Sequence, residues 1–407
     1  MITVAEISEC FPNNFKPFTG EFILQHARAL SAHCRVIMIV PLRFLPPKEL
    51  FSFNPFNTIS KIFKWFSKLN STHNFTEGNL KVIYLGYFIF PFSFMEFINV
   101  KILNNLFYKR VINILINEGC NLIYCNWIRP WAKLSCNIAA ELKVPFLIDH
   151  HEDIPTLKTL YPDNYKEYLK IFESAFKIIV HSNVNKIDIE NENLNLNEIK
   201  INHLGQNFSV SDIPKVFTLS EINLICVSHL HEPRKNIDVL INAVFLLKDE
   251  FKLKLKIVGD GNLKNKYSGL SDSLSLSDRI EFCGAKSQKE IGELLDASDI
   301  FILPSFPEAF GIVLTEAMAK GLPIISCTGN GGAEEISGLG YPVILTKPGS
   351  VSELAGAIIK LAADLSLMNL MSEAGKETVK ENFTWRQNGI STYEFIKQTL
   401  IEFKNKS

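Results

Sequence analysis

Short apolar segments that alternate with helical patterns dominate this sequence, and the alternation occurs twice. The first series of expected strands lies at residues 2–7, 35–40, 122–124, 145–148 and 178–180. The second series lies at residues 224–227, 255–258, 280–282, 300–303 and 323–326. Strands that alternate with helices form parallel sheets wound by right-handed crossovers. We therefore expect an α/β fold with two Rossmann-like, doubly wound domains.

The stretch between the two series marks the expected domain boundary. Residues 205–220 contain Pro214 and show no clear apolar periodicity, which is typical of a linker. At 407 residues the chain is also long for a single hydrophobic core. We place the first domain at residues 1–212 and the second at residues 213–385.

Composition excludes several classes of protein. The 42 Lys and Arg balance 43 Asp and Glu, so the net charge is −1 and we expect no nucleic acid partner. The longest apolar run, residues 82–95, is interrupted by Pro91 and is too short to cross a bilayer. The first residues carry Glu6 and Glu9 rather than the basic start and long apolar core of a signal peptide. We expect a cytoplasmic protein whose eight scattered cysteines are reduced.

The strongest local signal is residues 304–319, PSFPEAFGIVLTEAMA, which follow an expected strand. Ligands of doubly wound sheets bind beyond the carboxyl ends of strands, and a glycine at the start of a helix lets the backbone approach a ligand closely. Glu308 and Glu316 are eight residues apart, about 80° from eclipsed on a continuous helix, so the loop must help them to converge. The backbone amides that begin this helix and can hold phosphate oxygens are those of Gly311, Ile312 and Val313.

Polar residues also follow other expected strands. His150 and Asp153 lie just beyond the strand at 145–148, and ionisable residues gathered at such an end favour a ligand site. In the second domain Arg234 and Lys235 form a basic loop shortly after the expected strand at 224–227. Residues 258–261 read VGDG and lack the third glycine of a dinucleotide fingerprint, so an oxidoreductase is poorly supported.

Taken in order along the chain, these motifs resemble the retaining glycosyltransferases of family 4, the glycosyl transferases group 1, which have the GT-B fold. Glu308 and Glu316 match the E-x7-E signature of that family. The resemblance covers nearly all of the chain outside residues 41–110. It implies that a final helix crosses back onto the first domain, and we place that helix at residues 386–407.

The resemblance assigns the sugar, the ribose and the base to particular residues. His150 matches the active-site histidine, although His151 replaces the glycine that follows it in the family. Glu308 is expected to grip the donor sugar and Glu316 to accept hydrogen bonds from ribose hydroxyls. Ala285 ends a turn that resembles the one lining the nucleotide base.

The donor diphosphate has its own set of expected contacts. By the resemblance, Gly20 faces the diphosphate, and Lys235 and the amides after Phe310 hold it. His229 stands where the family has an arginine, and we expect the neighbouring Arg234 to supply the missing guanidinium.

The resemblance implies an enzyme that moves a sugar from a nucleotide diphosphate sugar, such as a UDP-sugar, to a glycan or polyprenyl-diphosphate-linked acceptor. It implies that the anomeric configuration of the sugar is retained. The reaction is expected to serve bacterial surface polysaccharide synthesis. The nucleotide sugar is a co-substrate, and we expect no cofactor and no metal because side-chain cations and helix ends can offset the diphosphate charge. Two alternatives stay open. One is a nucleotide-sugar epimerase or hydrolase on the same fold. The other is a non-catalytic sugar-nucleotide- or glycan-binding protein, suggested by His229 and His151.

Basic and aromatic residues gather in residues 41–110, which we expect to be an insertion in the first domain. Nine Lys and Arg stand there against three Glu, together with 17 of the chain's 45 aromatic residues. Two interpretations stay open. The stretch is either a core helix pair with solvated lysines, or a surface that binds anionic lipid at the inner face of the cell membrane and guides a lipid-diphosphate acceptor.

Overall fold

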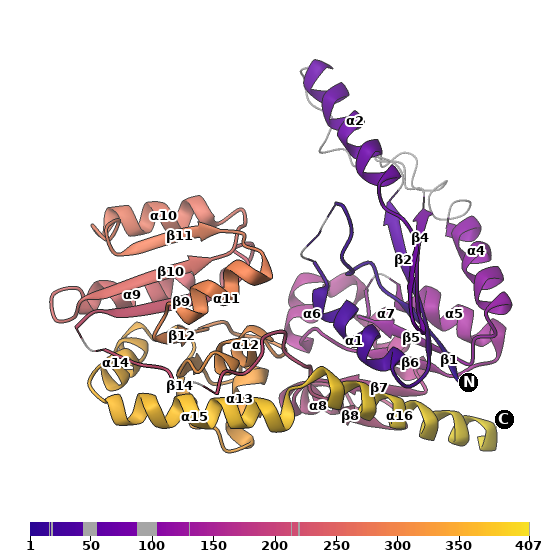
Figure 1. The fold of residues 1–407 in the computed structure, drawn as a ribbon. Helices are drawn as coiled ribbons and strands as arrows, with labels where there is room; N and C mark the ends of the chain where they lie inside the picture. Colours follow the sequence, from indigo (N-terminus) through magenta and orange to yellow (C-terminus); the bar gives the residue numbers. More distant parts are fainter. Residues whose placement is uncertain are drawn as a thin grey trace.

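Two parallel β-sheets, one in each half of the chain, organise the fold and lie side by side in Figure 1. The computed structural model of the chain describes residues 1–15, 17, 19–43, 55–87, 104–129, 131–212, 214–218 and 220–406. In both halves short apolar runs form the strands, and helical crossovers return the chain to the same end of the sheet.

The first sheet has eight described strands in the order β3-β4-β2-β1-β5-β6-β7-β8. Neighbouring strands are parallel except β3 and β4, which pair antiparallel. The strands are β1 (Thr3–Ile7), β2 (Arg35–Arg43), β3 (Phe75–Glu77), β4 (Leu80–Tyr87), β5 (Leu122–Asn126), β6 (Phe146–Asp149), β7 (Lys177–Val180) and β8 (Ile199–Ile201). The helices are α1 (Glu21–Ser31), α2 (Pro55–Asn70), α4 (Asn104–Asn117), α5 (Ala132–Leu142), α6 (Ile154–Leu160), α7 (Pro162–Ser174) and α8 (Asn183–Glu190).

The second sheet has six described strands, all parallel, in the order β11-β10-β9-β12-β13-β14. They are β9 (Ile222–Val227), β10 (Leu253–Val258), β11 (Ile280–Gly284), β12 (Ile300–Ile302), β13 (Ile324–Cys327) and β14 (Ile344–Thr346). The helices of this half are η4 (Pro233–Lys235), α9 (Ile237–Leu247), α10 (Lys264–Ser273), α11 (Gln288–Asp296), α12 (Val313–Ala319), α13 (Gly331–Gly338), α14 (Val351–Ala362), α15 (Leu365–Asn382) and α16 (Trp385–Lys406).

Alternate residues of β2 enter different cores on the two sides of the first sheet. Val36, Met38 and Val40 pack with residues of α1 and α16, whereas Ile37 and Ile39 pack with residues of α4 and α5. Because strand side chains alternate with a period of two, a strand that is covered on both faces must be apolar at every position. This explains why β2 reads as a continuous apolar run.

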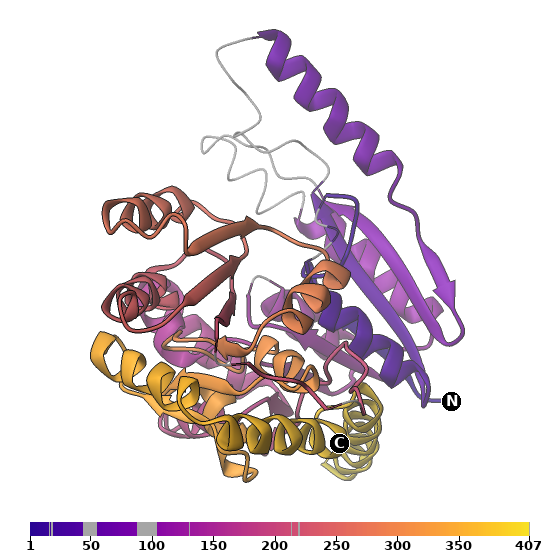
Figure 2. The same cartoon turned by 60° about the vertical axis from the view of Figure 1, so that its left-hand side comes forward.

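The last two helices connect the two halves of the molecule. α15 lies along the second domain, and α16 then runs beneath the first domain (Figures 1 and 2). Gly389 lets α16 approach α1 closely, because a Cβ at this position would lie 2.6 Å from the backbone of Ala29. Elsewhere at the boundary, His203 Nε2 lies 2.7 Å from Glu335 Oε1, which joins the end of the first domain to α13.

The predicted α/β fold with two parallel sheets is confirmed, and each of the ten expected strands overlaps an observed one. The sequence reasoning missed β3, β4, β8 and β14. β4 was hidden in the long apolar run at residues 82–95, because a continuous apolar run does not distinguish a buried strand from a helix. The strands β3, β8 and β14 have only three residues each, too few to show a period.

Residues 41–110 are not a simple insertion, which corrects the expectation from sequence. They contain the end of β2 and all of β4, and these two strands pair in parallel over eight residue pairs. The interpretation as a core helix pair holds for α4, where Phe107 and Val111 are buried, and is wrong for α2, where Phe56 and Phe63 are 82% and 73% exposed. The aromatic residues of this stretch that lie at 44–54 and 88–103 fall outside the described residues.

Within the described residues no single helix has both the length and the apolar character needed to cross a membrane. One pair of consecutive helical segments, Val351–Ala362 and Leu365–Lys406, is together long and apolar enough for a membrane span by length and composition alone. The two segments are bent by 95° where they meet.

We predict that Gly389→Ala will destabilise the protein, because the added methyl group overlaps the backbone of Ala29 in α1. The expected loss in the free energy of unfolding is about 1–3 kcal/mol, typical of overpacking. Gly356→Ala in α14 is the matched control, since no atom lies within 4 Å of the added Cβ. It should gain about 0.5–1 kcal/mol from helix propensity. Equal melting temperatures for the two variants would show that α16 does not pack tightly on α1.

Candidate functional site

A cleft of about 750 Å³ lies between the two domains. Its walls are formed by loops that follow the carboxyl ends of β1, β5, β6 and β7 on one side and of β9 and β12 on the other. Parallel strands place all of these loops at one edge of each sheet, so the cleft lies where doubly wound folds bind ligands. The lining residues that sequence reasoning singled out are Asp153, His229, Arg234, Lys235, Glu308, Phe310, Gly311 and Ile312.

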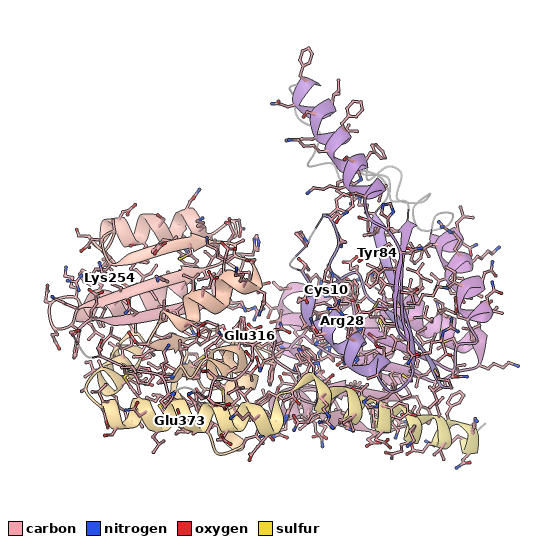
Figure 3. The ribbon with its side chains drawn as sticks, viewed as in Figure 1. Cys10, Arg28, Tyr84, Lys254, Glu316 and Glu373 are labelled. Carbon is pink, nitrogen blue, oxygen red and sulfur yellow. The ribbon has the colours of Figure 1, made fainter. Side chains whose placement is uncertain are left out.

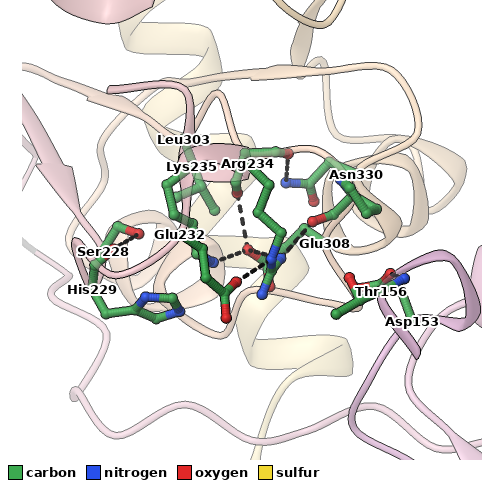
Figure 4. Close-up of polar contacts among 12 residues, drawn as sticks. Asp153, Thr156, Ser228, His229, Glu232, Arg234, Lys235, Leu303, Glu308 and Asn330 are labelled. Atoms are coloured by element: carbon green, nitrogen blue, oxygen red, sulfur yellow. Dashed lines mark hydrogen bonds and ion pairs between the residues drawn. The ribbon is translucent and has the colours of Figure 1, made fainter. Parts of the chain in front are cut away.

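Glu308 is held by cations in the wall of this cleft (Figure 4). Lys235 Nζ donates to Glu308 Oε2 at 2.5 Å, and Ser305 Oγ donates to the same oxygen at 2.9 Å. Arg234 Nη1 lies 3.7 Å from this oxygen. Burial by itself would raise the pKa of Glu308, but the charges of Lys235 and Arg234 outweigh burial and hold the pKa below its ordinary value. The carboxylate is therefore ionised and fixed at neutral pH.

The basic loop is fastened to the loop that carries Glu308. Arg234 Nη1 donates to the Pro307 carbonyl at 2.5 Å, and the Arg234 carbonyl accepts from Phe306 N at 2.9 Å. Arg234 also pairs with Glu232. His229 lines the same wall, but its pKa is lowered to about 4 by burial and by the nearby charge of Lys235. His229 is neutral at pH 7, so Arg234 and not His229 supplies a second positive charge beside Lys235.

Glu316 lies on α12, and its surroundings differ from those of Glu308. It belongs to the second domain near the boundary with the first (Figure 3) and does not line the main cleft as the described residues define it. Its Oε1 accepts from Gln288 Nε2 at 2.6 Å and from Asn207 Nδ2 at 3.2 Å. In the described part of the chain no cationic side chain lies within ion-pair distance of the Glu316 carboxylate. Burial raises the pKa of Glu316 to about 7. The two glutamates thus differ in charge state and in position.

A hydrogen bond from α16 orients the amide that contacts Glu316. Trp385 Nε1 donates to Asn207 Oδ1 at 3.0 Å, so the amide nitrogen of Asn207 is left to face the carboxylate. The start of the crossover helix therefore positions a partner of Glu316.

The remaining donor-side residues predicted from the sequence lie at different distances from the cleft. Gly20 precedes α1 with φ of 75°, and a Cβ there would lie 2.1 Å from the Cys10 carbonyl. Gly20 therefore allows the loop that carries Cys10 to reach the cleft, but it does not itself line the cleft. Gly311 also has a positive φ, 75°, and lies in the cleft wall. Val313, at the start of α12, and Ala285, which is exposed after β11, are not among the residues that line the cleft.

The chain is similar to known proteins in sequence over part of its length and in fold over nearly all of it. Residues 211–378 match the family model described as "Glycosyl transferases group 1". The match identifies the second domain as that of a group 1 glycosyltransferase. This confirms the family predicted from the sequence, and family 4 agrees with the relatives below.

Three curated relatives show how far the sequence similarity of this glycosyltransferase extends. An uncharacterised glycosyltransferase of Methanocaldococcus jannaschii is 28% identical over 69% of this chain and 76% of its own length. The N-acetyl-alpha-D-glucosaminyl L-malate synthase of Bacillus anthracis is 33% identical over 47% of this chain and 50% of its own. The lipopolysaccharide core biosynthesis glycosyltransferase LpsE of Rhizobium meliloti is 31% identical over 37% of this chain and 43% of its own length.

Solved structures confirm the predicted GT-B fold. A sucrose-phosphate synthase from Thermosynechococcus elongatus has a TM-score of 0.75 at 18% identity and covers 99% of this chain and 100% of its own. HepE of Anabaena, solved in complex with UDP and glucose, has a TM-score of 0.72 at 17% identity. The match covers 98% of this chain and 100% of the HepE chain.

His150 is not in the cleft of this glycosyltransferase, which corrects the assignment from sequence. Its ring is fully buried and packs edge-on against Phe172 of α7, whereas the next residue, His151, lines the cleft. Side chains alternate where the chain leaves β6, so adjacent histidines point to opposite sides. Burial, the largest cause, together with the neighbouring histidines His151 and His181, lowers the pKa of His150 to about 3. His151 is the histidine that can reach a bound ligand.

Buried polar groups hold His151 in place. His151 Nε2 lies 3.4 Å from Asp149 Oδ2, which also accepts from the Tyr124 hydroxyl at 2.6 Å. His181 Nε2 lies 3.0 Å from Asp149 Oδ1. Burial would raise the pKa of Asp149, but the two histidines outweigh it and hold this pKa well below its ordinary value. An ionised Asp149 therefore anchors both rings.

Asp149, His151 and His181 are the group in the described chain whose ligand atoms lie close enough to share a metal ion. These atoms all lie within 4.8 Å of one another. The rings of His151 and His181 stack at 4.4 Å with planes only 25° apart. An ion bound by two imidazoles lies close to both ring planes, which nearly parallel stacked rings do not allow. The arrangement fits a hydrogen-bonded support for His151 better than a metal centre.

Sequence reasoning missed several residues of the first-domain wall. Trp127 lines the cleft with φ of 74° and meets His151 edge-on at a centroid distance of 5.2 Å. Arg129 pairs with Glu152 and lies 3.7 Å above the ring centre of Tyr161. The available signal was position: these residues directly follow β5 and β6, at the same sheet edge as the residues that were predicted.

We predict that the stability of Glu316→Gln relative to the wild type will rise with pH. Between pH 4.5 and about 7 the unfolded carboxyl is ionised while the folded one holds its proton, so the wild type loses stability over this window. A glutamine does not titrate. The difference in the free energy of unfolding should grow by roughly 3 kcal/mol between about pH 5 and about pH 8.

Melting temperatures measured across this range check the prediction. Glu293→Gln, on the exposed side of α11, is the matched control and should follow the wild type at each pH. If the Glu316→Gln curve also runs parallel to that of the wild type, Glu316 does not titrate near neutrality.

Proposed function

We propose that this glycosyltransferase moves a sugar from a nucleotide diphosphate sugar to a glycan or lipid-linked acceptor and retains the anomeric configuration. The observation that carries the proposal is the contact of Glu308 with Lys235 and Arg234 in a wall of the interdomain cleft, opposite His151 of the first domain. HepE, which shares the fold, was solved with UDP and with UDP-glucose, and this supports a uridine nucleotide as the donor.

The charges of the cleft suit a diphosphate leaving group. Lys235 and Arg234 lie side by side, and their positive charges would offset the charge that grows on the diphosphate as the sugar departs. The loop amides of Gly311 and Ile312 lie in the same wall. Because side chains can supply this positive charge, we propose a reaction that needs no metal ion.

The two glutamates would bind different parts of the donor. Glu308 is ionised and its second oxygen, Oε1, can accept hydrogen bonds from hydroxyls of the sugar. Glu316 uses Oε1 for Gln288 and Asn207, which leaves Oε2 for the ribose hydroxyls. Hydrogen bonds from the ribose hydroxyls would stabilise the ionised form of Glu316, so binding of the donor would lower the pKa of this carboxyl.

The transfer step exchanges one bond to the anomeric carbon for another. The oxygen of an acceptor hydroxyl forms a bond to the anomeric carbon on the face from which the nucleoside diphosphate leaves, and the bond to the phosphate oxygen breaks. The leaving phosphate takes the proton of that hydroxyl. His151 would hydrogen-bond the sugar from the first domain, so closure of the cleft would bring the donor and the facing residues together.

Relatives support a role in bacterial surface polysaccharide synthesis. LpsE is named for lipopolysaccharide core biosynthesis, and another relative, AmsK of Erwinia amylovora, is named for amylovoran biosynthesis. We propose that this chain acts in the cytoplasm at the inner face of the membrane on a surface glycan precursor.

Incubation with a panel of nucleotide sugars, with and without glycan acceptors, tests the proposed function. We predict a new glycosidic product only when an acceptor is present, and a loss of turnover of at least about a hundredfold in Glu308→Gln with nearly unchanged binding of UDP. Glu316→Ala should weaken UDP binding instead.

The other activities give different results in the same assay. A product formed without acceptor would show an epimerase or hydrolase, and UDP binding without any transfer would show a binding protein.

Arg234→Ala should raise the KM for the donor, whereas Lys266→Ala, an exposed change on α10 of the same domain, should not. Equal KM values for these two variants would contradict the role given to Arg234.

We also propose that α2 places the enzyme on an anionic membrane surface. This helix projects away from the rest of the first domain (Figures 1 and 2), and it contains three lysines and no acidic residue. Its exposed apolar side chains are Phe56, Ile59 and Phe63. Lysines with aromatic side chains on one helix are the pattern of helices that lie in the interface of anionic membranes.

Vesicles of phosphatidylglycerol and phosphatidylcholine test this surface. The wild type should sediment with them at low salt and be released at high salt, because screening weakens the contact of lysines with headgroups. Phe56→Ser with Phe63→Ser should reduce the sedimented fraction, whereas Leu339→Ser, an exposed change after α13, should not. Equal sedimentation of both variants would rule out α2 as the membrane surface.

A further inference from the structure

A second cavity, of about 590 Å³, lies in the first domain at the base of α2. Four cationic residues line it, Arg43 from β2 and Lys61, Lys64 and Lys68 from α2, against one carboxylate, that of Glu9. In the part of the chain that the structure describes, no ion pair joins the three lysines to a carboxylate. The three lysines therefore bring to the cavity positive charge that no carboxylate of the described chain pairs with.

The residues of α2 that line the cavity share one face of the helix. Lys61, Lys64, Trp65 and Lys68 are spaced i, i+3, i+4 and i+7, so they point in one direction. Phe63 and the other exposed apolar residues project from the opposite side, about 180° around the helix axis. One face of α2 thus presents cations to a cavity, and the other presents apolar side chains to the surroundings.

Aromatic rings form the other walls of the cavity. Phe15 packs on Trp65 with ring centres 4.4 Å apart, which joins the amino-terminal loop to α2. Tyr87, at the end of β4, also lines the cavity, and its ring meets that of Trp131 edge-on with centres 5.2 Å apart. Burial, together with the charge of Glu9, raises the pKa of Tyr87 to about 12. This hydroxyl therefore keeps its proton at neutral pH and can donate a hydrogen bond.

The cavity adjoins the cleft between the domains. Glu9 lines both, and Trp131 Nε1 donates to Glu9 Oε2 at 3.2 Å, which holds this carboxylate at the boundary. A molecule seated among the lysines could therefore extend past Glu9 toward Glu308 and His151.

We propose that this cavity binds the phosphate or diphosphate group of the acceptor. The inference rests on the proposed function, because it gives the acceptor of that same transfer a chemical class. Three ammonium groups with no carboxylate partner can recognise phosphate oxygens, and the aromatic walls suit a sugar ring beside the phosphate. The acceptor hydroxyl would then lie beyond Glu9, where the donor sugar is bound. The phosphate can belong to a lipid-linked diphosphate or to a free phosphorylated sugar.

Titration calorimetry with inorganic pyrophosphate tests the cavity. Pyrophosphate would also occupy the donor cleft, so the full chain carries Arg234→Ala and Lys235→Ala as the reference. This protein should keep a binding site for pyrophosphate. Adding Lys61→Gln and Lys64→Gln should weaken that site by at least about tenfold. Lys266→Gln with Lys360→Gln removes the same charge from exposed positions of α10 and α14 and should leave the affinity within about twofold.

Equal affinity in the two sets of lysine variants, or no binding of pyrophosphate to the reference, overturns the proposal. UDP binding to a chain that carries only Lys61→Gln and Lys64→Gln separates this inference from the proposed function, because these lysines do not line the donor cleft. Its UDP affinity should equal that of the wild type. A loss would show that the substitutions act on the donor site and would overturn the proposal.

Neutral phosphatidylcholine vesicles, with and without farnesyl diphosphate, distinguish the two sources of the phosphate. If the reference protein sediments only with farnesyl diphosphate, and depends on Lys61 and Lys64 to do so, the cavity takes a lipid-linked diphosphate. If it ignores both kinds of vesicle but binds pyrophosphate through these lysines, the cavity takes a free phosphorylated sugar. Sedimentation with farnesyl diphosphate that does not depend on the lysines overturns the proposal.

Discussion

Parallel pairing of strands is the constraint on which the rest of this structure depends. It forces each chain crossover to return to the same end of a sheet, so the loops at the carboxyl ends gather along one edge. Here two such edges face each other across one cleft, and α16 holds them there by packing on α1. Residues as distant in sequence as Cys10, His151 and Glu308 therefore line the same space.

Charge placement gives the two glutamates of the signature different properties. Glu308 is buried beside Lys235 and Arg234, and it stays ionised because their charges outweigh the cost of burial. Glu316 is buried beside neutral amides, which donate hydrogen bonds but carry no charge, and its pKa is raised to about 7. Two identical side chains eight residues apart thus differ in protonation because one is paired with cations and the other is not.

The first domain carries a cluster of positive charge of its own. Its lysines on α2 lie along one face and line a cavity beside the cleft, whereas aromatic and aliphatic side chains project from the other face. The lysine face of α2 would thus contact phosphate groups, those of the acceptor and those of lipid headgroups, whereas the opposite face would bring apolar side chains to the lipid. The net charge of −1 for the whole chain conceals this arrangement.

Local pattern determined most of the fold and several of the residues that line the cleft. Apolar segments alternating with helices were enough to predict two parallel sheets, and the run from Pro304 to Ala319 was enough to predict the loop that carries Glu308. Only the tertiary structure decided which of two adjacent histidines faces the cleft, because the direction in which a side chain leaves a strand depends on the sheet around it. Packing likewise decided that β4 is a strand of the first sheet and that α2 projects from it, since an apolar run in the sequence does not reveal what covers it.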